Sequence, residues 1–330
     1  MKNPFVTNGY VSPEYFCDRE KETTKIVSLL TNENNIALIS PRRLGKTDLL
    51  RHCFGQPEIK EHYHTFIIDI YATSSVRDFV NVFGKAVLDE LRPKGKSVWR
   101  TFLNVLASLR SEITFDMNGQ PTWGIGLGAI TNPSATLDEI FSYLNNAGKP
   151  CLIAIDEFQQ ITKYADDPNI EAALRTHIQR CSNAHFVFSG SHRHLMGAMF
   201  TSPTRPFYQS VTLINLPPIS VDKYAEFCLK HFERASKLLD TLVVTELYER
   251  FNGITSYMQK VMNILFSMTG TGEICIPSMI DTAINDLLDF SADTYDALLY
   301  QMPEKQRIVF MAIAAEGKAK AISSGGFVRK

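Results

Sequence analysis

The sequence predicts an α/β fold: a parallel β-sheet with helices, interrupted by a β-hairpin and followed by an all-α domain. Two short apolar segments, 36–39 and 151–155, are each followed by polar residues, which is typical of strands buried on both faces of a parallel sheet. Residues between them show mainly helical periodicity. After Pro217-Pro218 the pattern becomes helical, and we place the first domain boundary there because proline ends regular structure.

The composition is that of a soluble globular protein. With 330 residues the chain has room for more than one domain. The formal net charge of −1 argues against a dominant nucleic-acid or membrane surface. No apolar run approaches a membrane span, and Met1–Tyr10 lacks a signal-peptide core. We therefore expect a cytoplasmic protein with no membrane partner.

The cysteines show no C-x-x-C pair and no spacing typical of a zinc or disulfide framework. We expect them to be small buried hydrophobes in a reducing compartment. The six are Cys17, Cys53, Cys151, Cys181, Cys228 and Cys275.

Segment 35–50 reads as a short strand, a polar loop and the start of a helix, with Gly45-Lys46-Thr47 where loop and helix meet. This arrangement is typical of a phosphate-binding loop, in which backbone N–H groups and the positive helix end converge on phosphates. We expect Gly45 to admit the phosphates closely, Lys46 to pair with them and the Thr47 hydroxyl to ligate Mg²⁺. The predicted nucleotide-binding residues are Ser40, Pro41, Arg42, Arg43, Leu44, Gly45, Lys46, Thr47 and Asp48.

Ser40 departs from the G-x-x-x-x-G-K-[ST] pattern, which has glycine at its first position. Serine is strained there if the position needs a positive φ. It fits if the position needs only a small side chain. Both alternatives are open from the sequence.

Further elements follow from periodicity and turn signals. An amphipathic helix opens at Cys17–Glu22, and its charged start lies either on the surface or beside the nucleotide base. Asn118-Gly119 indicates a hairpin within 113–130. Helices are expected at 76–91, 98–109, 137–147 and 170–181, and strands at 64–71, 185–191 and 211–216.

Two acids, Asp156 and Glu157, end the apolar strand that starts at 151. In α/β sheets, ligands bind at the carboxyl ends of the strands. We expect Asp156 to hold Mg²⁺ and Glu157 to orient and deprotonate the attacking water. The alternative is that both acids are solvated and cap the helix that starts near Phe158.

The strand at 185–191 ends in small polar residues followed by His192-Arg193-His194. We expect Ser191 to sense the γ-phosphate or hold the water against Glu157, with Arg193 as a charge partner. Arg205 and an arginine from a neighbouring molecule are alternative sources of transition-state charge. The two histidines have poor metal-ligand spacing, which favours loop histidines over a zinc site.

Beyond residue 217 we expect a helical domain, 217–292, with helices at 221–235, 241–251, 256–268 and 276–290. The last segment, 293–330, contains a helix at 304–316 and a short polar turn. It resembles the opening of a helix-turn-helix module, and we expect the natural chain to continue.

With these elements placed, the chain resembles the AAA+-related P-loop ATPases of the signal-transduction (STAND) type, and most of all the archaeal-type ATPases. The resemblance covers nearly the whole chain, and the double-arginine phosphate loop is its most specific part. The residues that carry it are 16–22, 40–47, 152–157, 189–191 and 206–208.

The resemblance implies a P-loop core over residues 1–216 with strand order 5-1-4-3-2, then a helical lid, then a winged helix. It also implies ATP and Mg²⁺ as ligands. Besides Ser40, the chain departs from the family at 253–257, where relatives often carry a glycine-x-proline sensor and this chain has Gly-Ile-Thr-Ser-Tyr.

Three functions are compatible with these features. The favoured one is an ATPase switch that binds ATP or ADP and acts on a DNA or protein partner through its C-terminal region, as a monomer or a homo-oligomer. The second is a DNA-binding, initiator-like protein in which ATP is structural. The third is an interaction module that binds nucleotide and hydrolyses it poorly.

Overall fold

The computed structural model describes residues 2–91, 113–115, 121–123 and 133–317. Its centre is a parallel sheet in the order β2-β5-β6-β1-β7. Read from the other edge and numbered by position in the chain, this is the predicted order 5-1-4-3-2, which is confirmed. The strands are β1 (Ile36–Ile39), β2 (His64–Asp69), β5 (Cys151–Asp156), β6 (Ala184–Gly190) and β7 (Thr212–Asn215).

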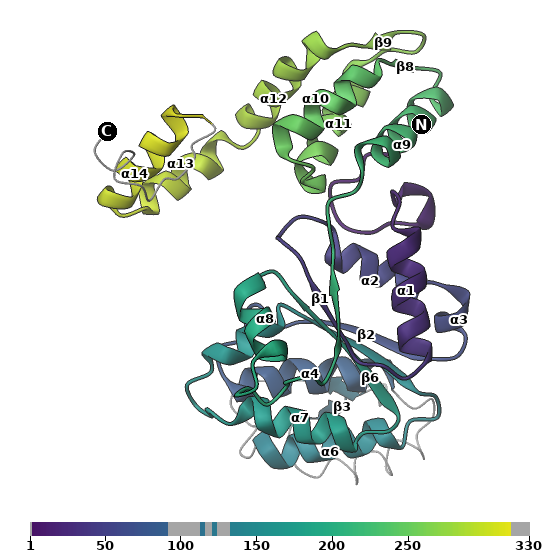
Figure 1. Ribbon diagram of the computed structural model, residues 1–330, viewed down its shortest axis with the longest axis vertical. Helices are drawn as coiled ribbons and strands as arrows, with labels where there is room; N and C mark the ends of the chain where they lie inside the picture. Colours follow the sequence, from purple (N-terminus) through teal and green to yellow (C-terminus); the bar gives the residue numbers. More distant parts are fainter. Residues whose placement is uncertain (1, 92–112, 116–120, 124–132, 318–330) are drawn as a thin grey trace.

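Helices cover both faces of this sheet, as expected where the strands are buried on both sides (Figure 1). One face is covered by α1 (Glu20–Thr31), α2 (Lys46–Phe54) and α3 (Pro57–Lys60). The other face is covered by α4 (Val76–Glu90), α6 (Pro133–Asn145), α7 (Ile170–Arg180) and α8 (Arg193–Thr201). The sequence did not predict α8.

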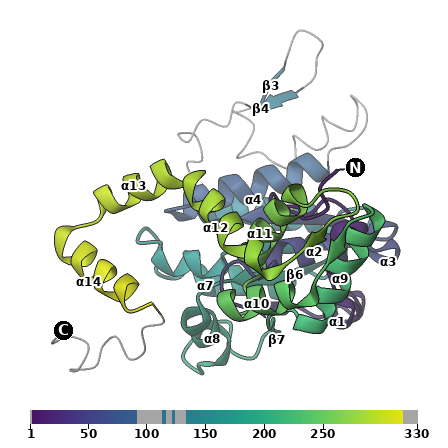
Figure 2. The same ribbon diagram turned by 90° about the horizontal axis from the view of Figure 1, so that it is seen from above.

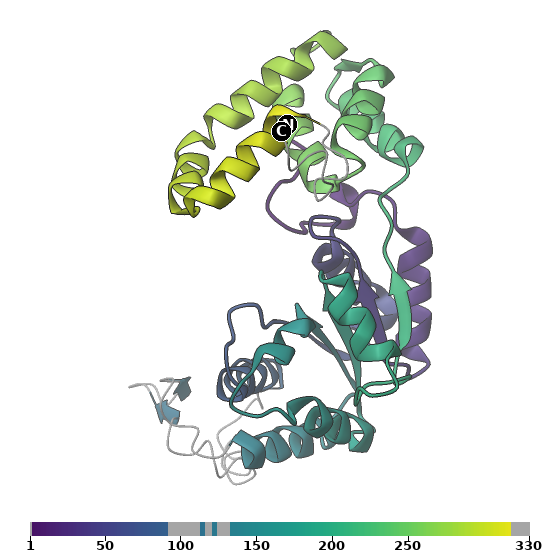
Figure 3. The same cartoon turned by 60° about the vertical axis from the view of Figure 1, so that its left-hand side comes forward.

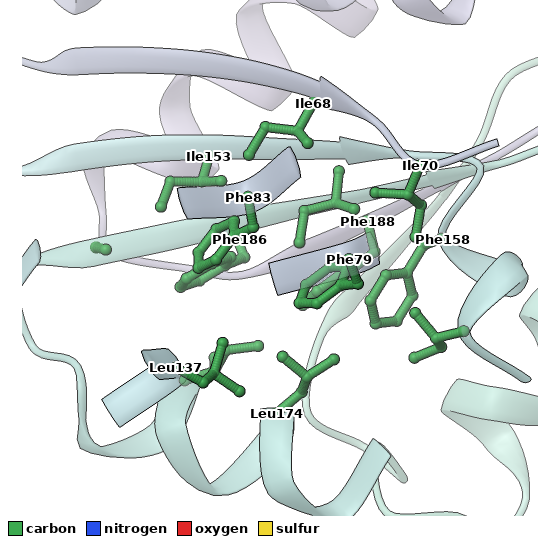
Figure 4. Close-up of a cluster of buried hydrophobic side chains, with 14 of the residues drawn as sticks. Ile68, Ile70, Phe79, Phe83, Leu137, Ile153, Phe158, Leu174, Phe186 and Phe188 are labelled. Atoms are coloured by element: carbon green, nitrogen blue, oxygen red, sulfur yellow. The ribbon is translucent and has the colours of Figure 1, made fainter. Parts of the chain in front are cut away.

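Aromatic side chains fill the core on the α4 face (Figure 4). The Phe186 and Phe188 rings of β6 stack 6.1 Å apart between their centroids. Phe158, at the start of the 3₁₀ helix η3 (Phe158–Lys163), lies 4.4 Å from Phe188. This packing anchors the chain directly after the carboxyl end of β5, where Asp156 and Glu157 lie.

An antiparallel pair, β3 (Ile113–Phe115) and β4 (Pro121–Trp123), interrupts the α/β pattern. It confirms the predicted hairpin. The helix predicted at 98–109 and the turn at Asn118-Gly119 lie outside the described residues.

The helical lid follows β7. Its helices are α9 (Val221–Arg234), α10 (Thr241–Phe251), α11 (Thr255–Met268), η4 (Pro277–Met279) and α12 (Ile280–Asp289), close to the predicted bounds. Two strands, β8 (Leu238–Leu239) and β9 (Ile274–Cys275), also pair in parallel. Strands of two residues are too short to give an alternating pattern, so the sequence predicted helices alone.

The segment before α1 packs into the lid, although it is far from the lid in sequence (Figure 3). It includes the 3₁₀ helix η1 (Pro13–Tyr15). The Phe5 ring is fully buried, with centroids 5.7 Å from Phe266 and 5.9 Å from Phe232. Asn263 Nδ2 donates to the Phe5 carbonyl at 2.7 Å. The amino-terminal segment therefore joins the lid to the sheet domain.

Beyond the lid, α13 (Ala292–Gln301) and α14 (Glu304–Ala315) extend away from its body (Figures 1 and 2). Neither helix contains a buried residue. Large apolar side chains are exposed on both, such as Tyr300 and Ile308.

All six cysteines are free and buried, as the sequence predicted. Burial raises the pKa of Cys17 and Cys53 to about 12, so these thiols stay protonated. None of the helices in the described part of the chain has the length and apolar character needed to cross a bilayer.

We expect Phe5→Ala to lower the free energy of unfolding of the lid by about 3–5 kcal/mol, because truncating a buried phenylalanine leaves a cavity. Chemical denaturation, monitored by hydrogen exchange of the backbone amides in α9 and α11, measures the effect. Leu242→Ala, at a lid side chain that is 62% exposed, is the control and should change stability by less than about 0.5 kcal/mol. Equal effects of the two substitutions would show that the amino-terminal segment does not stabilise the lid.

Candidate functional site

The loop between β1 and α2 adopts positive φ at Arg43 (69°) and Gly45 (81°). Ser40 is not among the residues with positive φ, so serine is unstrained at this position. Its side chain is fully buried, and Oγ donates to the Pro41 carbonyl at 3.0 Å. The position therefore needs a small side chain, which decides between the two alternatives left open by the sequence.

Lys46 begins α2 and is buried, with 7% of its surface exposed. Burial lowers the pKa of its ammonium group, while the nearby carboxylates of Asp156 and Glu157 act in the opposite direction. The α2 amino terminus adds unpaired N–H groups and positive potential at the same place. This end of the sheet is therefore suited to an anion.

Thr47 and Asp156 meet across the edge of the sheet. The Thr47 hydroxyl donates to Asp156 Oδ2 at 2.5 Å. They come from the chain after β1 and the end of β5, two strands that flank β6 in the sheet. Parallel strands place their carboxyl ends at one edge, so residues far apart in the sequence come together there.

Glu157 follows β5 with a left-handed backbone conformation (φ 54°). Its Oε2 atom accepts hydrogen bonds from Ser191 Oγ at 2.8 Å and from Gln159 Nε2 at 2.5 Å. Arg42 Nε in turn donates to Ser191 Oγ at 3.3 Å. The structure thus brings Glu157, Ser191 and the phosphate loop together, as the sequence predicted, and adds Gln159, which the sequence gave no signal to select.

A cavity of about 550 Å³ lies between the phosphate loop, the amino-terminal segment and the lid. This volume is within the range of small-molecule sites. Of the nine predicted nucleotide-binding residues, 42–48 line it, whereas Ser40 and Pro41 do not. Asp156 and Glu157 also line it.

The amino-terminal segment supplies polar and aromatic groups to this cavity, among them Tyr10, Phe16 and Arg19. Arg19 is 3% exposed and donates to Glu22 at 3.0 Å, while its Nη2 has no hydrogen-bond partner within the described ranges. Asp48 also faces the cavity, and burial raises its pKa, against the opposing effects of Arg51 and the Tyr10 N–H. The charged start of the first helix therefore borders the cavity, which favours the prediction that it lies beside a bound ligand.

The lid contacts the phosphate loop directly. The Ser256 N–H, in the first turn of α11, donates to the Arg43 carbonyl at 3.2 Å. The Arg43 guanidinium lies over the Tyr257 ring, 4.9 Å from its centroid, and donates to the Tyr257 hydroxyl. These contacts occur in the 253–257 segment. The positive end of α11 thus also faces the cavity.

The two arginines predicted to supply transition-state charge, Arg193 and Arg205, have different surroundings. Arg193 is the first residue of α8 and is exposed, and its side chain forms no hydrogen bond or ion pair with another described residue. Arg205 forms an ion pair with Glu171. His192 and His194 are exposed, and the described residues contain no group of three or more His, Cys, Asp or Glu side chains suited to a metal.

Residues 16–261 match a family model described as an ATPase domain predominantly from Archaea. The chain belongs to this family. The match confirms the predicted resemblance to archaeal-type ATPases. Residues 293–330 match a second model, described as a probable winged helix domain. None of the curated proteins compared with the chain matches it.

Solved structures of similar fold include the Walker-type ATPase of Pyrococcus abyssi, with a TM-score of 0.62 and 18% identity over 94% of this chain and 81% of that one. The Aeropyrum pernix ORC1 protein in complex with DNA has a TM-score of 0.60 and 12% identity over 97% and 78% of the two chains. The ORC2 protein of the same organism, with ADPNP and ADP, has a TM-score of 0.59 and 14% identity over 99% and 79%. At these identities the likeness shows a shared fold.

We expect Tyr257→Ala to loosen the lid, because it removes the ring that holds the Arg43 guanidinium. Hydrogen exchange of the Ser256 amide, which donates to the Arg43 carbonyl, should accelerate about tenfold. Tyr71→Ala is the matched control, because the Tyr71 ring lies 5.5 Å from the guanidinium of Arg42, a neighbour of Arg43 in the phosphate loop. Within the described residues, Arg42 has no such ring contact with the lid. Equal acceleration in both variants, or none in either, would contradict a specific Arg43–Tyr257 link.

Proposed function

We propose that the chain binds ATP with Mg²⁺ in the cavity, hydrolyses it and acts as a switch through its lid. One observation carries the proposal: the Thr47 hydroxyl and the Asp156 carboxylate meet at 2.5 Å in a cavity that Lys46 and Glu157 also line. The family and the similar folds support nucleotide binding. The placement among signal-transduction ATPases is part of the proposal.

The residues present fit a magnesium nucleotide. Mg²⁺ prefers oxygen ligands and is usually held by one or two protein groups, with phosphates and waters completing its shell. Thr47 Oγ1 and Asp156 Oδ2 are two such oxygens at one point. When bound, the ion would neutralise charge on the β- and γ-phosphate oxygens. In this account Lys46 and the amino terminus of α2 hold the same phosphates.

Glu157 is the proposed general base. Its carboxylate would take a proton from a water whose oxygen attacks the γ-phosphorus. The bond from the γ-phosphorus to the bridging oxygen then breaks, its electron pair stays on ADP, and phosphate is released. Ser191 Oγ donates a hydrogen bond to the Glu157 carboxylate, and Arg42 Nε donates one to Ser191 Oγ. We assign transition-state charge to Arg193 or to an arginine of a neighbouring molecule, because Arg205 is paired with Glu171.

The switch follows from how the cavity is enclosed. Its wall comes from three parts of the chain, so bound nucleotide would contact the sheet domain, the lid and the amino-terminal segment together. Closing such parts over a substrate excludes water and completes a site. We propose domains at 1–216, 217–292 and 293–330. The last domain would contact a DNA or protein partner, and the position of the lid would control this contact.

We expect Glu157→Gln to bind ATP with nearly unchanged affinity but to slow turnover about 100- to 10,000-fold, since it keeps the shape and removes the base. Lys46→Met should instead weaken ATP binding about 100-fold. Phosphate release and titration with a fluorescent ATP analogue separate the two effects. Glu58→Gln and Lys60→Met, both exposed on α3, are matched controls and should leave both measurements unchanged. ATP hydrolysis by Glu157→Gln at the wild-type rate would refute the role of Glu157.

DNA binding is a second candidate function, favoured by the winged-helix match at 293–330. That segment has six basic and four acidic residues, which is a weak basic excess. Its affinity for DNA would come from contacts between these basic side chains and phosphates, and it should fall as salt rises.

We expect a fluorescent DNA duplex to bind the chain at low salt, with affinity that falls as salt rises. Anisotropy titrations at several salt concentrations, with and without ATP, measure this. The double substitution Lys305→Ala and Arg307→Ala on α14 should weaken binding more than the same change at Lys60 and Lys149 in the sheet domain. No binding at low salt would remove this candidate and leave the ATPase proposal intact.

A further inference from the structure

Gln159 has a buried side-chain amide whose nitrogen forms a hydrogen bond and whose oxygen forms none with the described residues. The residue is 3% exposed and lies in η3, directly after Glu157 and Phe158. Its Nε2 donates to Glu157 Oε2 at 2.5 Å. Its Oε1 has no hydrogen-bond partner among the residues that the structure describes. Burying an unpaired carbonyl oxygen is unfavourable, so the fold carries a cost that an apolar side chain of similar size would avoid.

The orientation of the amide follows from its partner. An ionised carboxylate can only accept hydrogen bonds, so the nitrogen of Gln159 must face Glu157. The oxygen then points to Gly190, at the end of β6, where a Cβ would overlap both Gln159 Oε1 and the Met196 side chain. Gly190 has no positive φ, so glycine serves close approach here and not backbone conformation. The glycine thus leaves room for the buried amide and for Met196.

Ser191 and Gln159 act on the same atom. Both donate to Glu157 Oε2, and within the described part of the chain no hydrogen bond reaches Oε1. Two donors on one oxygen restrict the rotation of a long side chain that is otherwise mobile. The second oxygen stays available to a water in the cavity that Glu157 lines.

We propose that Gln159 is a positioning residue for Glu157: its buried amide, together with Ser191, holds Oε2 and directs Oε1 toward the attacking water. The inference rests on the proposed function, in which Glu157 is the base. Gln159 is not among the residues that line the cavity, whereas Glu157 is, so its effect on turnover passes through Glu157.

The test is a double-mutant cycle on the full chain with ATP, combining steady-state phosphate release and titration with a fluorescent ATP analogue. Gln159→Met keeps the size of the side chain and removes the donor. It should lower kcat about tenfold or more, with KM and nucleotide affinity within about twofold. In a Glu157→Gln background it should have no further effect in single-turnover measurements, because the group it positions is gone.

Gln160→Met is the matched control. The neighbouring Gln160 amide also donates one hydrogen bond, but to the Thr73 carbonyl at 2.9 Å, so its loss should leave kcat within about twofold. Gln159→Leu, made in parallel, should behave as Gln159→Met does. Melting temperature and ADP binding identify any variant that does not fold.

Wild-type kcat in a folded Gln159→Met or Gln159→Leu protein would overturn the inference. So would an equal further loss in the Glu157→Gln background, because Gln159 would then act independently of Glu157. Wild-type turnover by Glu157→Gln itself would instead overturn the proposed function. The two failures are therefore distinguishable.

Discussion

The hydrogen bond between Thr47 and Asp156 is the contact on which the site depends. It joins the first turn of α2 to the end of β5 across the width of β6. Neighbouring strands lie about 4.8 Å apart, so two strands separated by a third are about 10 Å apart at their backbones. The parallel register puts the carboxyl ends of β1 and β5 at one edge, and the loop after β1 brings Thr47 within hydrogen-bond distance of Asp156. The charge of Lys46 and the carboxylate of Glu157 are placed by the same register.

The order of the strands also decides which groups lie between the loop and the acids. β6 lies between β1 and β5, and it ends at Gly190. The next residue, Ser191, therefore lies within hydrogen-bond distance of Glu157. The aromatic core beneath, where Phe158 packs on Phe188, fixes the chain immediately after the acids. The segment 156–159 contains both the acids of the site and the core residue Phe158, so packing in the core affects the geometry of the site.

Much of this arrangement was predictable from the sequence, because the signals were local. Gly45-Lys46-Thr47 and Asp156-Glu157 are contiguous motifs, and wholly apolar strands indicate a parallel sheet. The contacts that the sequence missed are long-range. Nothing near Phe5 indicates that it packs among lid helices more than 200 residues away, nor that Tyr257 lies against Arg43. Gln159 looks like an ordinary polar residue until its burial beside Gly190 is seen.

In the proposed function, a single magnesium nucleotide is bound where the loop and the acids meet. The most direct measurement is a crystal structure with Mn²⁺ and a non-hydrolysable ATP analogue, with the metal located by its anomalous scattering. We predict the metal peak beside Thr47 Oγ1 and the Asp156 carboxylate, with the terminal phosphate between Lys46 and Glu157. Nucleotide bound elsewhere, or a metal peak remote from both Thr47 and Asp156, would contradict it.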